Sequence, residues 1–265
     1  MKASVTKALA RKKRGQASQS LLNEFHDLSD NELILRLRDD LPDVRAAAAL
    51  QLGQRKCVAA VVQLCFLLET ESALYPRINA SKALAEIGAP SLDSLILLLG
   101  KIGDVHRELP AKGFYKKSYP LPRDLAVRTI VRTGPIALNQ LNNVIKGTDR
   151  NTILEAIDGI GHISFYHDDT SSEQLLVKTY QRFQSDELVK WKIIRAFQAF
   201  SSPEVKKILG EVLDTSQHPA HRWEAARSLA LMKSPMDLRT IAKIKRDENK
   251  EVRKIINFFV RQNSS

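Results

Sequence analysis

The stretch Asp43-Val44-Arg45-Ala46-Ala47-Ala48-Ala49-Leu50-Gln51-Leu52-Gly53 decides the fold, because its pattern returns along the chain. A turn leads to a cation, then to small residues and a large apolar residue. With the cation as position zero, the pattern recurs at Arg45, Arg77, Arg123, Arg150, Lys190, Arg222 and Arg253. Position +3 is small or apolar each time, with Ala48, Ala80, Ala126, Ile153, Ile193, Ala225 and Ile256. Position +7 is large and apolar, with Leu52, Leu84, Ile130, Ile157, Phe197, Leu229 and Val260. Such an internal repeat indicates a repeat protein.

Each repeat predicts a pair of helices. Positions +3 and +7 share one face of a helix, so the first helix of each pair has one buried stripe. A second apolar segment of helix length follows, at residues 58–68, 92–99, 136–145, 175–183, 205–213 and 238–244. One pair cannot bury its own apolar face, so the pairs must stack. The sequence therefore predicts an all-α, right-handed α-solenoid of about seven helix pairs.

The pattern resembles the HEAT-repeat superfamily, and most of all its short bacterial type named after phycobilisome lyases. The segment from Asp43 to Gly53 matches that repeat well, and so does the segment from Pro76 to Gly88. The resemblance covers residues 30–262. It implies HEAT-like helix pairs whose second helices line a concave face, but it implies no single function, because the repeat serves many roles.

Acidic residues stand shortly before three of the cations, at Asp43, Glu187 and Glu251. We expect them to pair with cations of adjacent repeats. Such a ladder would be structural, so Arg45 and Arg77 are not expected to bind a partner.

Net charge divides the chain into two parts. The formal net charge is +11, and residues 1–20 contribute six cations and no acid. We expect a basic arm over residues 1–20 and a single solenoid over residues 21–265. The arm is either a solvated, partly disordered segment or an electrostatic contact for nucleic acid or an acidic partner.

Several function classes leave no signature. The chain has no Gly-rich phosphate loop, no G-x-S-x-G and no H-E-x-x-H. This favours a non-enzymatic protein without a cofactor, although a site assembled from separate helices would leave no local motif. His162, His167, Asp168 and Asp169 could suggest a metal, but a polar loop that caps the next helix is the favoured interpretation.

Location follows from the cysteines and from hydropathy. Cys57 and Cys65 lie eight residues apart in one helical segment, too far apart for a disulfide. We expect reduced thiols in a cytoplasmic protein. No apolar run approaches the length that spans a membrane.

An insertion at residues 101–120 is the leading candidate site. The step from Arg77 to Arg123 is 46 residues, against 32 for the step before it. Insertions in repeat proteins map to loops that often bind partners. Its candidate contacts are aromatic and basic: Arg107, Lys112, Phe114, Tyr115, Lys116, Lys117 and Tyr119. They could stack on bases and contact phosphates, or the aromatics could pack back on the solenoid.

Two tryptophans occupy position +1 of successive repeats. Trp191 is followed by Arg195 and Trp223 by Arg227, so each arginine can lie over its indole. Because other repeats place mostly small or polar residues at +1, we expect both tryptophans at the surface or the edge of the core. They form either two stabilising stacks or a partner-binding patch.

The second helices add polar side chains to the expected concave face. They are Asn142, Lys146, Lys178, Arg182, Lys206, Lys207, Arg239 and Lys243. A groove of this character could hold a phosphate backbone, although a solvated helix face would look the same.

Three functions remain as hypotheses. The first is a non-enzymatic scaffold that binds another protein through the concave face and the 101–120 insertion. The second is a nucleic-acid binder. HEAT-like DNA glycosylases share the architecture, but the sequence places no Asp beside Trp191 or Trp223. The third is a bilin lyase or isomerase like the enzymes that name the repeat.

Overall fold

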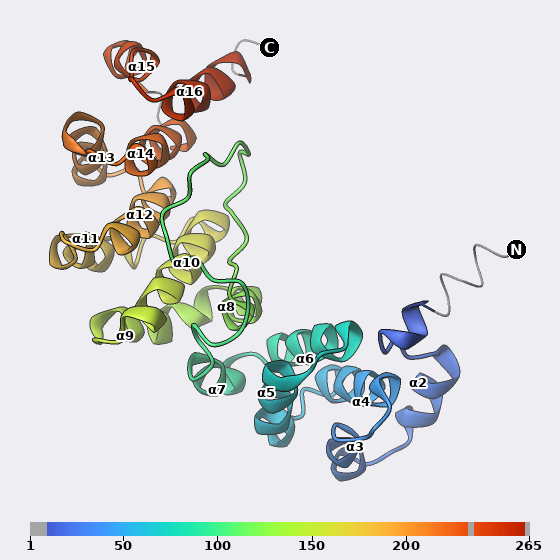
Figure 1. Cartoon of the computed structure of the whole chain (residues 1–265). Coiled ribbons are helices and arrows are strands. Elements are labelled where there is room, and N and C mark those ends of the chain that lie inside the picture. Colours follow the sequence, from blue (N-terminus) through green and yellow to red (C-terminus); the bar gives the residue numbers. More distant parts are fainter. Residues whose placement is uncertain (1–9, 233–235, 263–265) are drawn as a thin grey trace, which may run out of the picture. The chain divides into compact units, whose positions relative to one another are not determined.

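The computed structural model describes residues 10–232 and 236–262, with side chains up to residue 257. Within these ranges the chain forms helices and connecting loops, and one isolated antiparallel bridge joins Gly103 to Asp124. The predicted all-α solenoid of helix pairs is confirmed (Figure 1). By its internal contacts the chain divides into two compact units. Unit 1 is Met1–Gly103 with Asp124–Ala137, and unit 2 is Asp104–Arg123 with Leu138–Ser265.

Unit 1 stacks the first helices of the first three repeats. These are α4 (Pro42–Gln54), α6 (Leu74–Ile87) and α8 (Leu125–Ile130), and each packs on the next. The second helices are α5 (Val61–Thr70), which continues η1 (Val58–Ala60), and α7 (Leu92–Ile96), which continues η2 (Ala89–Ser91). Two helices precede the first repeat, α2 (Gln19–His26) and α3 (Asp30–Arg36), and both pack on α4. The unit ends with η3 (Val131–Ala137).

Unit 2 has two layers of helices, which are clear in Figure 1. One layer holds the first helices α10 (Arg150–His167), α12 (Glu187–Ala196), α14 (Pro219–Leu231) and α16 (Lys250–Gln262). The other holds the second helices α9 (Leu138–Lys146), α11 (Glu173–Arg182), α13 (Pro203–Thr215) and α15 (Leu238–Lys245). The short η4 (Phe197–Ala199) ends the run of α12.

The repeat positions form the core, as the pattern predicts. Every residue at position +3 is buried. The position +7 residues from Leu52 to Phe197 are fully buried, and Leu229 is half-buried. Val260 lies outside the described side chains. Removing apolar surface from water stabilises a protein by about 25 cal/mol per Å², so burial of this stripe is the main force that holds neighbouring helix pairs together.

The repeating cation has two structural tasks. At Arg45, Arg77, Arg222 and Arg253 it donates hydrogen bonds to main-chain carbonyls five or six residues earlier, where the turn enters the helix. Arg45 bonds Asp39 O at 2.7 Å, and Arg222 bonds Ser216 O at 2.8 Å. In these four repeats the cation holds the entry to the first helix, which explains its fixed distance from the turn.

The cation also pairs with an acid that precedes the next repeat. The pairs are Arg45–Glu71 at 2.7 Å, Arg150–Asp186 at 2.5 Å and Arg222–Asp247 at 2.8 Å. A ladder therefore exists, but two of the acids expected from the sequence do not belong to it. Asp43 accepts from the Val44 N–H, and Glu251 pairs with Lys254 of its own repeat. Glu187 pairs with Lys190 of its own repeat and also lies 3.4 Å from His221 Nδ1 of the next one.

The expected polar loop after residue 162 is wrong, because α10 continues to His167. The helix ends at Asp168, whose φ of 54° places it in the left-handed region. His162 packs its ring on Tyr166, with the centroids 4.7 Å apart. Burial lowers the pKa of His162.

The basic arm is described from residue 10 onward, and residues 1–9 lie outside the described residues. Gly15 is buried, and a Cβ at that position would lie 2.8 Å from Pro76 and 2.9 Å from Pro42. The Tyr75 N–H donates to the Arg14 carbonyl at 3.0 Å. This end of the arm therefore packs on the first repeats.

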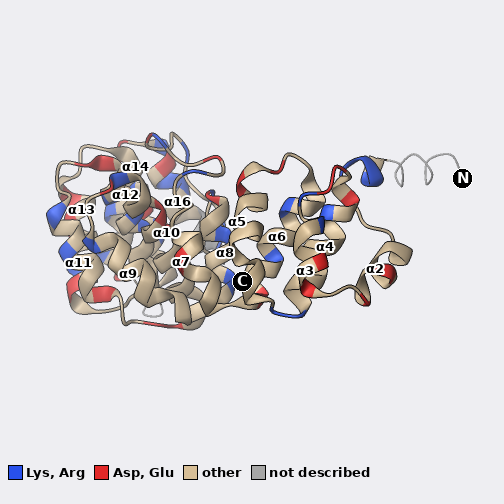
Figure 2. Ribbon diagram, turned by 90° about the horizontal axis from the view of Figure 1, so that it is seen from below, with Lys and Arg blue, Asp and Glu red and all other residues tan. Residues whose placement is uncertain are grey.

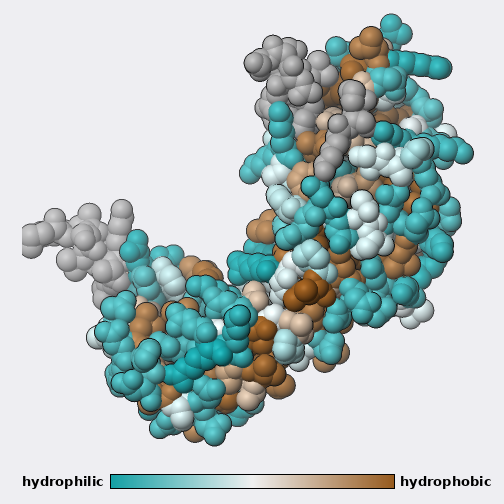
Figure 3. Space-filling model, turned by 180° about the vertical axis from the view of Figure 1, so that it is seen from behind, coloured by the Kyte–Doolittle hydropathy of each residue, from teal (hydrophilic) through white to brown (hydrophobic). Residues whose placement is uncertain are grey.

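Charged residues of both signs are distributed over the helices (Figure 2). Hydrophilic residues cover most of the face shown in Figure 3, with hydrophobic side chains in small areas between them. None of the described helices is long and apolar enough to cross a membrane.

Candidate interaction surfaces

The insertion forms a closed loop that we call the strap, residues 104–123. Its two ends meet at the Gly103–Asp124 bridge, where the Leu125 N–H donates to Ile102 O at 2.8 Å. The buried Asp124 carboxylate accepts from the N–H groups of Gly100 at 3.0 Å and Val127 at 2.8 Å. The carboxylate therefore fixes the base of the strap while it caps α8.

The body of the strap lies along the first-helix layer of unit 2, visible as the long green loop in Figure 1. Tyr119 contacts α10, where its ring centroid lies 5.9 Å from that of His162. His106 contacts α12, with its ring 5.1 Å from the Trp191 ring. On α16, the Tyr115 hydroxyl donates to Glu251 at 2.5 Å.

Arg227 of α14 holds the middle of the strap. Its Nη2 donates to the carbonyls of Ser118 at 2.8 Å and Lys116 at 3.3 Å, and its guanidinium lies 5.0 Å from the Phe114 ring. Main-chain recognition by a buried arginine fixes the course of the strap whatever its exposed side chains are.

A buried charge cluster lies in this layer, made of Glu155, Asp158, Lys192, Arg195, Glu224 and Arg227. Lys192 joins Glu155 at 2.6 Å and Asp158 at 3.0 Å, and Arg195 joins Asp158 at 2.5 Å. Glu224 and Arg227 pair along α14 at 3.1 Å. The cluster therefore holds three acids and three cations, so opposite charges are present in equal number.

Burial changes the ionisation of several of these groups. It raises the pKa of Glu224 and lowers that of Arg227. Burial also opposes ionisation of Asp158, but Arg195 and Lys192 outweigh it and lower the pKa of that carboxyl. His106 has a pKa lowered to about 4, first by burial and then by the charge of Arg195. The strap histidine is therefore uncharged at neutral pH.

The aromatic residues of the strap face inward. Tyr119 is buried, and Phe114 and Tyr115 are half-buried against α14 and α16. Of the two alternatives for these aromatic residues, this arrangement shows the second, in which they pack back on the solenoid. The basic residues Arg107, Lys112, Lys116 and Lys117 are exposed and form no ion pair among the described residues.

Of the two expected positions for Trp191 and Trp223, the surface or the edge of the core, the surface is wrong. Both are buried, with 1% and 2% of their surface exposed, and their rings lie 6.1 Å apart. Arg195 lies over Trp191 at 4.2 Å as predicted, whereas Arg227 lies over Phe114 of the strap instead of Trp223. The strap covers this part of the first-helix layer, and the repeat pattern alone does not predict that cover.

Asp158 is the carboxylate that the sequence could not place near Trp191, since Arg195 contacts both residues. All three side chains are buried. Their contacts with one another and with the strap account for them as core packing.

The second-helix residues lie in the other layer of unit 2. Lys146, Lys178, Arg182, Lys207, Arg239 and Lys243 are exposed there, and Asn142 and Lys206 are half-buried. Arg182 donates to the carbonyls of Ile145 and Lys146, and Lys243 pairs with Asp214. The strap lies on the opposite side of the first helices (Figure 1), so the expected joint surface of second helices and insertion does not form.

Unit 1 carries a surface that the sequence analysis missed. Val58, Val62 and Phe66 are 55%, 67% and 57% exposed, at spacings of four residues along η1 and α5. We call these three residues the α5 surface. Of the twelve large apolar residues exposed among the described side chains, nine belong to unit 1 and three to unit 2. The signal in the sequence was the segment from Val58 to Leu68, which is apolar on every face.

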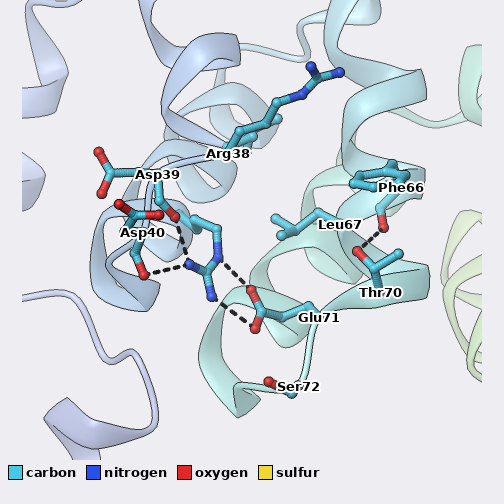
Figure 4. Close-up of a pocket in the computed structure, with 10 residues that line it drawn as sticks. Arg38, Asp39, Asp40, Phe66, Leu67, Thr70, Glu71 and Ser72 are labelled. Carbon is cyan, nitrogen blue, oxygen red and sulfur yellow. Dashed lines mark hydrogen bonds and ion pairs between the residues drawn. The ribbon is translucent and has the colours of Figure 1, made fainter.

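A pocket of about 640 Å³ adjoins the α5 surface at Phe66 (Figure 4). Leu67 and Phe66 line one part of it, and the Arg45–Glu71 ion pair lines another. Burial opposes ionisation of Glu71, but hydrogen bonds from Arg45 and from the Ala73 N–H lower its pKa. Figure 4 shows Asp39 and Asp40 on the opposite side from Phe66, with Arg38 between them.

The cysteines and the potential metal ligands give no candidate site. Cys57 and Cys65 are free, buried thiols, and burial raises the pKa of Cys65 to about 11. No group of three or more potential metal ligands gathers within the described residues.

Comparison with known proteins supports the repeat assignment. The HEAT repeats family matches residues 174–257, from α11 to α16. The match supports membership of this stretch in the HEAT-repeat superfamily. No curated protein matches the chain.

Proposed function

We propose that this protein is a non-enzymatic scaffold that binds another protein, with the α5 surface of unit 1 as its principal docking site. HEAT repeats commonly serve as protein-interaction scaffolds, so the family match is compatible with this role. Stacked helix pairs offer extended rigid surfaces that need no dedicated chemistry.

The observation that carries the proposal is the exposure of Val62 and Phe66. An exposed helix face normally carries polar residues, and large contiguous apolar areas on a protein surface mark interaction sites. Single exposed apolar residues need no explanation, but three at helical spacing beside a pocket do.

The exposed strap cations are a second, weaker docking candidate. Lys112, Lys116 and Lys117 lie on a segment fixed by Arg227, so an acidic partner would meet a largely preformed surface. Nucleic acid would be attracted by the same charges. The inward aromatic rings favour a protein partner, since sequence-tolerant binding of single strands uses stacking.

Similarity to the short repeats of phycobilisome lyases would suggest a bilin lyase or isomerase. That alternative rests on the sequence pattern of Asp43–Gly53 and its repeats alone. Unlike that alternative, the scaffold proposal accounts for the exposed apolar residues of the α5 surface.

The proposal is tested by quantitative affinity capture with the tagged full chain. Four forms are compared: wild type, Val62→Ser/Phe66→Ser, Lys112→Glu/Lys116→Glu/Lys117→Glu, and Leu238→Ser. Leu238 is 84% exposed in unit 2 and is the matched control. All substituted residues except Val62 and Phe66 lie outside the α5 surface, and all are exposed.

We expect a partner that is lost with the α5 double variant and retained with Leu238→Ser. A partner lost only with the strap variant would move the docking site to unit 2. Proteins captured equally by all four forms would contradict docking through either surface. Salt-sensitive capture of nucleic acid that follows the strap variant would instead favour a nucleic-acid binder.

A further inference from the structure

We propose that the first-helix layer of unit 2 is a docking site for an extended peptide segment of a partner protein, and that the strap fills this site within the free chain. The partner segment has the pattern of residues 113–119, with a glycine before two aromatic residues and a tyrosine four residues after the second of these. This site is separate from the α5 surface, so the two docking proposals fail independently.

The first step concerns the main chain of the strap, which forms no helix or strand of its own. Glu251 of α16 accepts from the Gly113 N–H at 3.3 Å. Arg227 of α14 donates to the carbonyls of Ser118 at 2.8 Å and Lys116 at 3.3 Å. Side chains of two successive first helices therefore bind groups that every peptide has. Main-chain hydrogen bonds of this kind give affinity for an extended peptide, and side-chain contacts give specificity.

The second step concerns the aromatic side chains that the layer accepts. The Arg227 guanidinium lies 5.0 Å from the Phe114 ring, a cation–π contact. The Tyr115 hydroxyl donates to Glu251 at 2.5 Å. Tyr119 is buried against α10. The same two helix residues that bind the main chain thus also contact aromatic rings, which selects segments with adjacent aromatic residues.

Two close approaches make the site more selective. A Cβ at Gly113 would lie 2.9 Å from the Ile255 Cδ1 atom of α16, so the main chain passes too near this helix for a larger residue. On α10, Gly161 leaves the space that the Tyr119 hydroxyl end fills. A partner segment therefore needs a small residue at the first point and a long aromatic side chain at the second.

The third step concerns how firmly the strap is held. Of residues 104–123, only Tyr119 and Pro122 are buried, so most of the segment lies at the surface. Because burial of apolar surface supplies most of the free energy of docking, a segment with so few buried side chains is a replaceable occupant. The Gly103–Asp124 bridge joins the ends of the strap, so the body can leave while its base stays closed.

The strap is also an incomplete occupant. Trp191 Nε1, Arg195 Nε and Glu224 Oε2 are buried and form no hydrogen bond among the described residues. Their side chains belong to residues that are 1%, 5% and 0% exposed. Buried polar groups are normally hydrogen-bonded, and each exception calls for an explanation. Trp191 packs on His106 of the strap, so a segment that supplies an acceptor there would fit this layer better than the strap does.

The experiment measures binding of a strap peptide in trans by fluorescence anisotropy. The probe is a fluorescein-labelled synthetic peptide of residues 109–122. It is titrated into the wild-type full chain and into two full-length forms with a weakened strap, Tyr119→Ala and Phe114→Ala/Tyr115→Ala/Tyr119→Ala. All of these substitutions lie in the strap, so the helices that form the docking site are unchanged. Circular dichroism of each form checks that the helices are folded.

Three variant peptides test which contacts carry the binding. Gly113→Ala adds the Cβ that meets Ile255, and Phe114→Ala removes the ring beside Arg227. Leu121→Ser is the matched control, because Leu121 is 58% exposed. Changes in a synthetic peptide cannot alter the fold of the protein, so they separate recognition from stability.

We expect both weakened forms to bind the parent peptide about tenfold or more tightly than wild type does, because a tethered strap competes at an effective concentration of about millimolar. Gly113→Ala and Phe114→Ala should each weaken binding of the peptide about fivefold or more. Leu121→Ser should leave the affinity unchanged. These results together support the inference.

Three outcomes overturn it. Folded weakened forms that bind the parent peptide no better than wild type would show that the layer does not accept a segment in trans. Equal binding of all four peptides would indicate non-specific adhesion. Loss of the helical signal in both weakened forms would show that the strap is an integral part of the fold. None of these outcomes bears on the α5 surface.

Discussion

The hydroxyl end of Tyr119 lies directly against Gly161 of α10. A Cβ at position 161 would stand 2.1 Å from the Tyr119 hydroxyl oxygen and 2.9 Å from the Ala196 Cβ. Only glycine therefore allows the strap to bring Tyr119 into the layer of first helices. A strap residue and a helix residue 42 positions apart in the sequence are thus a matched pair.

We expect Gly161→Ala to destabilise the protein. Overpacking of a core costs about 1–3 kcal/mol, which exceeds the helix-propensity gain of about 1 kcal/mol. Chemical denaturation followed by circular dichroism measures the change. Gly210→Ala is the matched control, because no atom lies within 4 Å of a Cβ placed there, and it should raise the free energy of unfolding. Equal effects at both positions would contradict the Tyr119 contact.

Removal of the Tyr119 hydroxyl should cost little. The oxygen is buried and has no hydrogen-bond partner within the described residues, so no hydrogen bond offsets the free energy lost when it leaves water. Tyr119→Phe should leave the free energy of unfolding unchanged or raise it by up to about 1 kcal/mol. The same change should lessen the damage from Gly161→Ala, which a double-mutant cycle measures. A marked loss of stability on Tyr119→Phe would show that the hydroxyl has a partner.

Arg227 should be needed to hold the strap. Arg227→Met leaves Glu224 buried without its cation and frees the carbonyls of Lys116 and Ser118, with an expected loss of about 3–5 kcal/mol. The strap should also become sensitive to trypsin at Lys112, Lys116 and Lys117. Arg227→Met/Glu224→Gln removes the unpaired charge and separates the two effects. Its strap should stay protease-sensitive although stability partly returns.

The contact of Tyr115 with Glu251 should weaken in acid. The Tyr115 hydroxyl and Lys254 lower the pKa of Glu251 to about 2, against an ordinary value of 4.5. The carboxylate therefore contributes stability that is complete above about pH 4.5 and is lost as pH falls towards 2. The stability difference between wild type and Tyr115→Phe should be largest at neutral pH and shrink through this window. A difference that is constant from pH 6 to pH 3 would contradict the contact.

Sequence periodicity was sufficient for the fold because its information is local. Ala48 and Leu52 lie on one helix face, and the same spacing recurs at each repeat, so the buried stripe and the helix pairs follow directly. The ion-pair partners of the repeating cation are harder to predict. Glu71 and Asp247 belong to turns whose distance from Arg45 and Arg222 depends on how the helix pairs stack.

The candidate site could be predicted only in part. The strap was visible as extra length, but the side to which it folds depends on long-range partners such as Arg227 and Gly161. For the same reason the sequence places Trp191 at the surface or the edge of the core, whereas His106 of the strap covers it. The α5 surface was readable in principle, since Val62 and Phe66 interrupt the polar face that an exposed helix needs.

Site-specific photocrosslinking from position 66 tests the central claim most directly. A photoreactive phenylalanine analogue replaces Phe66 in one form of the full chain and Leu238 in another, both exposed positions. After irradiation in cells, the crosslinked peptides are identified by mass spectrometry. The account predicts one recurrent partner peptide at position 66 that is absent at position 238. Adducts that are no more frequent or specific at position 66 than at position 238 would contradict the proposal that the α5 surface binds a protein.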